Sequence, residues 1–268
     1  MNNQKLKVLF MGGNHPRHLH YANALHSDFG LVGVVIQKRG KIMPSVPTFQ
    51  NEREEENYYR HFNDRAAAEE KYFGEQNIPN CEAITIEKEA LNTEATMDFV
   101  KKINPDVIFI FGCGMINTVF VDHLPFNTIN LHLGLSPRYR GSATLFWPFY
   151  FLEPNYAGST FHYITQEADA GDIIHQVRPE LEVGDQIHDV AYKIVLASAQ
   201  EGVRLLDHFQ EKGTWNKRLQ KSTGKHFLDG DFRPEHLSMI YDVYDNDVVN
   251  HYLEKKIQPR EPKLFKQF

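Results

Sequence analysis

Short apolar runs alternate with amphipathic stretches along most of this chain. Residues 7–13 and 31–37 are apolar, and a stretch with helical spacing over 16–26 separates them. A strand, a helix and a second strand within about thirty residues form a βαβ unit, which pairs its two strands in parallel. Residues 106–111 form the most apolar run, so we expect this strand at the centre of a sheet.

The same pattern continues in the second half of the chain. Residues 156–164 alternate as a strand does, and residues 172–177 follow as the partner strand across a turn that contains Gly171. The amphipathic stretch 185–209 predicts a helix that packs back on the sheet. Further strands are predicted over 83–86, 128–131 and 224–228, and further helices over 52–76, 93–102, 144–151, 234–244 and 247–255, with a short helix that ends near Pro125.

Candidate chemistry gathers where the predicted strand 128–131 opens into a loop. Asn130 and His132 are two residues apart, so on a strand both side chains leave the same face. Further along the chain, Asp169 lies in a tight turn just before Gly171. An amide donor, an imidazole and a carboxylate suit acyl transfer, which requires stabilisation of an oxyanion and movement of a proton. These three side chains are therefore the predicted catalytic residues.

Neighbouring residues have competing interpretations. Asp172 is an alternative to Asp169, although the Asp-x-Gly spacing favours Asp169. His162 lies on the strand that enters the turn, and we interpret it as a structural or substrate-contacting residue. Gly12 and Gly13 end the first strand, where doubly wound sheets bind ligands, but the Gly-x-Gly-x-x-Gly spacing of a dinucleotide site is missing.

Composition restricts the class of protein. Hydrophobic content is 41% and charged content 24%, as in ordinary globular proteins, and the apolar runs are too short to cross a bilayer. The net charge of −6 argues against a nucleic-acid partner. The 2 Cys and the scattered 14 His lack the spacing of a disulfide framework or a metal site, so we expect no metal. The N-terminus lacks a signal-peptide pattern, so we expect a cytoplasmic protein without a membrane anchor.

Three motifs of the chain together resemble the folate-dependent formyltransferase family. They are Asn-x-His at 130–132, the Ser-Pro…Gly loop over 136–141 and Asp-x-Gly at 169–171, and the similarity extends over residues 5–205. That family includes the glycinamide ribonucleotide, methionyl-tRNA and nucleotide-sugar amine formyltransferases. The resemblance implies an enzyme that takes a formyl group from 10-formyltetrahydrofolate and uses the amide, imidazole and carboxylate in catalysis. The loop begins Gly-Leu-Ser-Pro instead of the common Ser-Leu-Leu-Pro, which leaves its acceptor contacts undefined.

The resemblance also implies which residues contact the donor. They follow the central strand or precede the catalytic aspartate in the chain, and they are Gly114, Met115, Ile116, Val121, Ile164, Thr165, Gln166 and Glu167. Candidate acceptor contacts come from the turn after the first strand and from the basic part of the loop, where an ordinary turn or a solvated charge is an equally good interpretation. These candidates are Gly13, Asn14, His15, Arg138 and Arg140.

The predicted fold is α/β: a Rossmann-like, mostly parallel twisted sheet with helices on both faces, plus a small C-terminal appendage. We expect a formyltransferase catalytic domain over residues 1–209, with an inserted helix at 52–76, and the appendage over 210–268. The aromatic residues of the appendage could support a homodimer.

The charge and length of the chain favour some formyl acceptors over others. The acidic chain and the short segment after residue 209 argue against the basic barrel that methionyl-tRNA formyltransferases usually carry. Glycinamide ribonucleotide formyltransferases are usually shorter than this chain. The leading expectation is N-formylation of a small-molecule amine, with a nucleotide-linked amino sugar as the specific hypothesis. A catalytically silent folate- or nucleotide-binding module is the alternative of another class, against which the intact catalytic residues count.

Overall fold

A seven-stranded sheet forms the centre of the computed structural model, which describes residues 5–40, 43–125, 127–220 and 224–268. Across the sheet the strands are β3 (Glu82–Ile86), β2 (Gly33–Gln37), β1 (Val8–Gly13), β4 (Val107–Phe111), β5 (Thr128–His132), β7 (Ser159–Tyr163) and β8 (Ile173–Val177). The strands from β3 to β5 in this order are parallel to their neighbours, whereas β7 is antiparallel to both β5 and β8. The most apolar strand, β4, lies at the centre, and the mostly parallel sheet confirms the predicted α/β fold.

No helix in the described part of the chain is long and apolar enough to cross a membrane.

The longer helices lie where the sequence predicts them. The helices are α1 (Pro16–Phe29), α2 (Glu52–Phe73), α3 (Glu94–Ile103), α4 (Thr118–Val121), α5 (Trp147–Tyr150), α6 (Ile187–Lys212) and α7 (Val248–Leu253), with short 3₁₀ or π turns over Lys88–Ala90, Pro154–Tyr156, Asp229–Asp231, Pro234–His236 and Met239–Val243.

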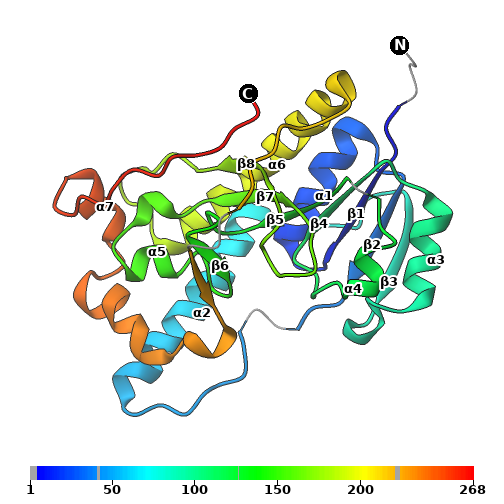
Figure 1. The fold of residues 1–268 in the computed structure, drawn as a ribbon. Coiled ribbons are helices and arrows are strands. Elements are labelled where there is room, and N and C mark those ends of the chain that lie inside the picture. The colour runs from blue at the N-terminus through cyan, green and yellow to red at the C-terminus, as the bar shows by residue number, and fades with distance from the viewer. Residues whose placement is uncertain (1–4, 41–42, 126, 221–223) are drawn as a thin grey trace.

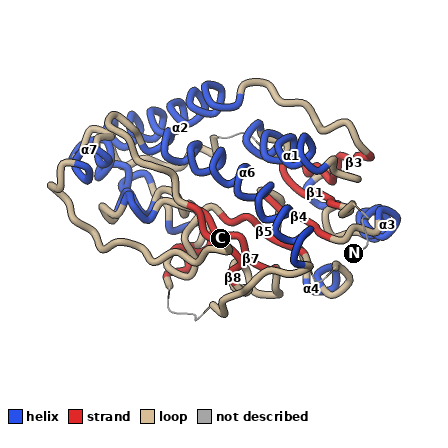
Figure 2. The backbone as a smooth tube through the Cα atoms, turned by 90° about the horizontal axis from the view of Figure 1, so that it is seen from above, coloured by secondary structure: helices blue, strands red, loops and turns tan. Residues whose placement is uncertain are grey.

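Helices cover both faces of the sheet because successive side chains of a strand point to opposite sides. Phe10 of β1 joins the core formed with α1 and α6, whereas the next residue, Met11, joins the core formed with α3 and α4. Every residue of β1 is buried, as expected for a strand covered on both faces. Figure 2 shows α6 lying across the strands on one of these faces. The predicted arrangement of helices on both faces is confirmed.

α2 is the helix predicted over 52–76. The side chain of Asn51 caps its first turn by accepting a hydrogen bond of 3.0 Å from the backbone N–H of Glu54. Acidic residues fill the first turn, where they favour the positive end of the helix dipole, and the helix ends at Gly74. The helix contacts both α1 and α6, so side chains on its inner face point into the body of the protein.

Two segments predicted as helices are less regular. α5 covers a single turn instead of 144–151, because Ala143 has a left-handed φ of 51° and the Thr144 hydroxyl donates to the carbonyl of Leu133. Residues 234–244 form a 3₁₀ turn and a π turn instead of one helix. In both places individual aromatic or aliphatic side chains pack into the core, and this packing overrides the local helical preference.

The C-terminal segment is joined to the rest of the protein by backbone hydrogen bonds. The predicted strand at 224–228 is β9 (Lys225–Phe227), which pairs in parallel with β6 (Tyr139–Gly141), a strand that the sequence did not predict. Near the C-terminus, the carbonyl of Phe265 accepts from the N–H of Gln176 at 2.8 Å. The end of the chain therefore lies along the outer edge of β8, as Figure 1 shows.

The connection between β7 and β8 brings backbone atoms very close together. A Cβ atom added to Gly171 would lie 1.7 Å from the carbonyl oxygen of Tyr163, well inside van der Waals contact. Only glycine fits at this position without a shift of the backbone.

We therefore predict that Gly171→Ala lowers the free energy of unfolding by about 1–3 kcal/mol, as overpacked sites usually do. Urea denaturation measures this change. Gly230→Ala is the matched control, because an added Cβ there meets no atom within 4 Å. The control should stay within about 0.5 kcal/mol of the wild type. Equal stability of the two variants would contradict the crowding at Gly171.

Candidate active site

Strand pairing brings the predicted catalytic residues together. Asn130 and His132 end β5, and the antiparallel register places His162 of β7 directly opposite Asn130. Asp169 follows in the connection to β8, where its φ of 51° turns the chain back toward β5. The side-chain amide of Gln220 holds this connection by donating to the carbonyls of Asp169, at 3.0 Å, and of the nearby Gly171, at 2.7 Å.

The carboxylate of Asp169 is the common contact of this group. Its Oδ2 lies 3.3 Å from Nδ1 of His132 and accepts a hydrogen bond of 3.1 Å from the N–H of Gly141. Its Oδ1 accepts from Nδ2 of Asn130 at 3.4 Å and lies 3.5 Å from Nε2 of His162. The residues predicted from separate stretches of sequence therefore meet around one carboxylate.

The hydrogen-bond partners assign a role to each imidazole. Nδ1 of His162 lies 2.8 Å from the Tyr163 carbonyl and donates to it, so its Nε2 accepts from the Asn130 amide at 3.1 Å. His162 thus orients the amide of Asn130. Nε2 of His132 donates to the Tyr139 carbonyl at 3.0 Å, which leaves Nδ1 facing the Asp169 carboxylate. His132 can therefore take up a proton on the nitrogen that faces Asp169.

Burial and neighbouring charges shift the pKa values of Asp169 and His132 in opposite directions. Burial alone would raise the pKa of Asp169, but the two histidines and the Gly141 N–H outweigh it and hold this pKa well below its usual range. Burial lowers the pKa of His132, while the Asp169 carboxylate opposes that shift. At neutral pH the site therefore contains an ionised carboxylate beside an imidazole that is mostly neutral and can accept a proton.

A small cavity of about 160 Å³ opens beside this group. Asn130, His162 and Asp169 form part of its wall. Apolar side chains such as Ile110 form another part, and loop backbone runs along the rest. The structure places every residue that was predicted to contact the donor in this wall: Gly114, Met115, Ile116, Val121, Ile164, Thr165, Gln166 and Glu167.

The predicted acceptor-contacting residues do not lie together. Asn14 accepts from the N–H of Arg39 at 2.8 Å, directly beyond Gly13, and Nε2 of His15 lies 2.7 Å from the Gly40 carbonyl. These contacts hold the turn after β1 against the loop after β2.

The two arginines of the loop 136–141 point to different places. Arg140 is 6% exposed and its Nη1 lies 3.5 Å from Glu167, beside the small cavity. Arg138 is instead bound to Glu153 and stacks on Tyr156, away from Asp169. Arg138 lies just before β6, and its ion pair with Glu153 keeps its guanidinium apart from the group around Asp169.

A larger cavity of about 640 Å³ lies between α2, α6 and the loop that follows His132. Arg17, Arg39 and Arg65 line it, and Arg17 forms an ion pair of 2.7 Å with the buried Glu69. Sequence reasoning missed this group, because each arginine lies in a different segment and resembles an ordinary surface charge.

Aromatic and histidine side chains complete the wall of the larger cavity. Phe62, Phe146 and Phe232 contribute rings, and His61 and His188 lie between them. Burial, together with the charge of Arg65, lowers the pKa of His188 to about 3, and burial also lowers the pKa of His61. Both imidazoles are therefore neutral near pH 7, so the positive charge of this cavity comes from its arginines.

Chain neighbours of the residues that contact Asp169 line the larger cavity. Leu133 and Ser142 belong to its wall, and each directly follows a residue whose atoms contact Asp169, namely His132 and Gly141. Asn130 and Asp169 themselves line the small cavity, so the group around Asp169 lies next to both cavities.

The sequence model of the formyl transferase family matches residues 41–203, which is more than half of the chain. The protein belongs to the formyl transferase family. The family predicted from the three motifs is confirmed, and the protein is a formyl transferase family enzyme.

Known relatives are consistent with this membership. Methionyl-tRNA formyltransferase of Clostridium tetani is 38% identical over 52 residues, which make up 19% of this chain and 17% of that protein. The phosphoribosylglycinamide formyltransferase structure from Anaplasma phagocytophilum aligns over 84% of this chain and 99% of its own, with a TM-score of 0.57 and 15% identity. An Anoxybacillus kamchatkensis formyltransferase, solved with UDP-4,6-dideoxy-4-formamido-L-AltNAc and tetrahydrofolate, aligns over 90% and 95%, with a TM-score of 0.51 and 18% identity. Both solved structures have the same fold as the protein described here.

The electrostatic coupling in the site leads to a prediction about His132. Replacing Asp169 with Asn removes the negative charge that favours the imidazolium form, so the pKa of His132 should fall further below 6.5. Histidine NMR titrations of the wild type and the variant measure the shift. Asp98→Asn, an exposed change on α3, should leave the titration of His132 unchanged. An unaltered pKa in Asp169→Asn would show that the two groups are not coupled.

Proposed function

We propose that this protein transfers a formyl group from 10-formyltetrahydrofolate to a primary amine on a nucleotide-linked amino sugar. The observation that carries this proposal is the position of the Asn130, His132 and Asp169 group between a small cavity and a large basic one. A transferase for two substrates requires this arrangement, because the reacting atoms of both must meet at one point.

The small cavity fits the donor's flat heterocyclic ring. Ile110, Ile116 and Val121 offer apolar contact to the faces of a ring, and the loop 164–167 forms another part of the wall. Gly114 has no side chain to narrow the opening between them. When bound, 10-formyltetrahydrofolate supplies an acyl carbon attached to a nitrogen that can leave. Two related structures contain tetrahydrofolate or folinic acid, which supports the same donor class here.

The catalytic residues have complementary tasks in formyl transfer. The acceptor nitrogen forms a bond to the formyl carbon, and the bond from that carbon to the carrier nitrogen breaks. Asn130 donates a hydrogen bond to the formyl oxygen as negative charge develops on it. His132 moves the proton lost by the acceptor nitrogen to the carrier nitrogen, and Asp169 stabilises the imidazolium form during this movement.

The large cavity supports an anionic acceptor. Arg39 and Arg65 form no ion pair with a described acidic side chain, so both guanidinium groups can bind a diphosphate. The aromatic wall offers contact to a base or sugar ring. Nucleotide-linked amino sugars carry both features. Related enzymes have been solved with UDP- or dTDP-linked sugars, which is in line with an acceptor of this class.

A panel of acceptors tests the proposal. The purified protein is incubated with 10-formyltetrahydrofolate and UDP- or dTDP-linked 3-amino and 4-amino sugars, glycinamide ribonucleotide or methionyl-tRNA. Tetrahydrofolate release and the mass of the product report transfer. We expect a formylated nucleotide sugar. Transfer to another acceptor would correct the substrate class, and no transfer to any acceptor would favour a silent binding module.

Kinetics should distinguish the two candidate aspartates. Asp169→Asn removes the charge that stabilises protonated His132, so kcat should fall by about 10²–10⁴-fold, with little change in the KM for the donor. Asp172→Asn is the matched control in the same connection, where Asp172 pairs with Lys217 at 2.8 Å. The control should keep kcat near the wild-type value. A larger loss of kcat in Asp172→Asn would reverse the assignment.

A second variant pair tests the acceptor cavity. Arg65→Gln removes a charge from the cavity wall and should raise the KM for a nucleotide-linked acceptor by about tenfold, with an unchanged KM for the donor. Arg60→Gln is the control on the same helix, because Arg60 binds Asp245 at 3.1 Å and does not line the cavity. If both variants give the same acceptor KM as the wild type, the large cavity does not hold the acceptor's anionic group.

A further inference from the structure

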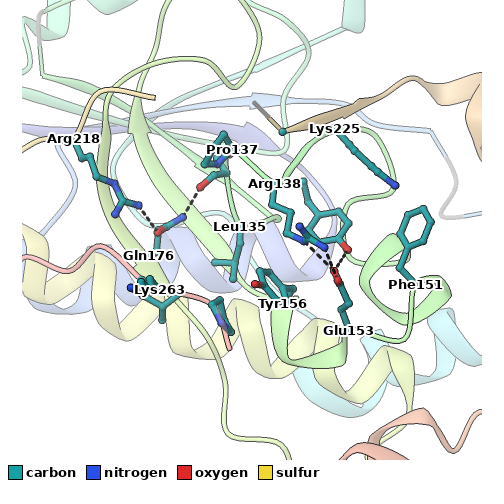
Figure 3. Close-up of a pocket in the computed structure, with 15 residues that line it drawn as sticks. Leu135, Pro137, Arg138, Phe151, Glu153, Tyr156, Gln176, Arg218, Lys225 and Lys263 are labelled. Atoms are coloured by element: carbon teal, nitrogen blue, oxygen red, sulfur yellow. Dashed lines mark hydrogen bonds and ion pairs between the residues drawn. The ribbon is translucent and has the colours of Figure 1, made fainter. Parts of the chain in front are cut away.

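A third cavity lies on the other side of the catalytic loop. It has a volume of about 530 Å³, and its wall is built from the loop 135–139, the start of β9 and the tail 262–264 (Figure 3). None of its described lining residues belongs to either of the cavities beside Asp169. Neither the donor nor the acceptor of the proposed reaction therefore accounts for it.

The acidic group of this cavity is already bound. Glu153 accepts from Nε of Arg138 at 2.9 Å, from Nη2 of the same guanidinium and from the Tyr139 hydroxyl at 2.6 Å. Figure 3 shows the guanidinium of Arg138 directed at the carboxylate of Glu153. The charge of Arg138 therefore offsets that of Glu153, and neither is left to balance another ion.

The remaining cations have no acidic partner among the described residues. Nη2 of Arg218 donates to the neutral amide oxygen of Gln176 at 3.2 Å. Nζ of Lys225 lies 3.8 Å above the centre of the Phe151 ring, and Lys263 is exposed at the cavity edge. In the view of Figure 3, Arg218 and Lys263 lie toward one end of the cavity and Lys225 toward the other. Positive charge is therefore spread along the cavity and is uncompensated.

We propose that this cavity binds a small polyanion, a ligand with two or more phosphate or carboxylate groups, independently of the catalytic site. Separated cations match a ligand with separated negative groups better than a single monovalent anion. The rings of Phe151 and Tyr156 also line the cavity and provide contact for the part of the ligand between its charges.

The position of this site gives ligand binding a path to the catalytic residues. The side chain of Tyr139 lines the cavity, while its carbonyl accepts the hydrogen bond of 3.0 Å from His132. Nearby, Gln176 donates to the carbonyl of Ser136 at 2.7 Å and thus holds the start of the same loop. The wall of the polyanion site is therefore also the support of His132.

Calorimetric titration with pyrophosphate, and separately with citrate, tests the proposal. The reference protein is Arg65→Gln, in which anion binding to the acceptor cavity is weakened. We expect this protein to bind at least one of the two probes, and the stronger probe identifies phosphate or carboxylate as the preferred chemistry. In the same background, Lys225→Gln with Lys263→Gln should weaken binding by about tenfold or more. Both lysines are exposed, so the fold should tolerate the change.

Lys101→Gln, on the exposed side of α3, is the matched charge control and should bind the probes as the reference does. The proposal is overturned if the lysine pair binds as tightly as the control. It is also overturned if Arg65→Gln abolishes all binding, because the anion would then occupy the acceptor cavity alone. Arg218→Gln, added singly to the reference, should reproduce the weakening at the other end of the cavity.

Discussion

The contact between the partly buried carboxylate of Asp169 and Nδ1 of His132, at 3.3 Å, is the interaction on which the rest of the site depends. Burial disfavours a charged carboxylate, and this one is maintained by the imidazoles, by the Asn130 amide and by the Gly141 N–H. The same contacts fix the direction of each partner. The contacts that stabilise the charge of Asp169 therefore also orient the neighbouring side chains. Removing this charge would affect both the electrostatics and the geometry of the site.

The fold meets this requirement by reversing the direction of one strand. The parallel part of the sheet ends at β5, and the antiparallel β7 places His162 beside Asn130. The connection to β8 then returns to β5 and delivers Asp169. A continuous parallel sheet would have carried the next strand end to the same edge through a long crossover. The antiparallel hairpin brings a carboxylate to the amide and imidazole within a short stretch of chain.

The loop after His132 divides the surroundings of the catalytic group into separate environments. One side has a small, partly apolar cavity, the second a large cavity with arginines and aromatic rings, and the third the basic cavity against the C-terminal tail. Tyr139 joins the third cavity to the group around Asp169, because its carbonyl accepts from His132 while the same residue lines the third cavity. The tail itself covers the edge of β8 and so protects an otherwise open strand.

The sequence by itself determined the order of strands and helices, the central position of β4, the family and the identity of the residues around Asp169. Apolar periodicity records which local faces are buried, and the Asn-x-His and Asp-x-Gly spacings are short enough to be read directly. Tertiary structure alone decided the pairing of β6 with β9, the shortening of α5 and the gathering of arginines from three segments. These features depend on contacts between distant parts of the chain, and a local pattern of polar and apolar residues carries no record of which distant segment will lie opposite.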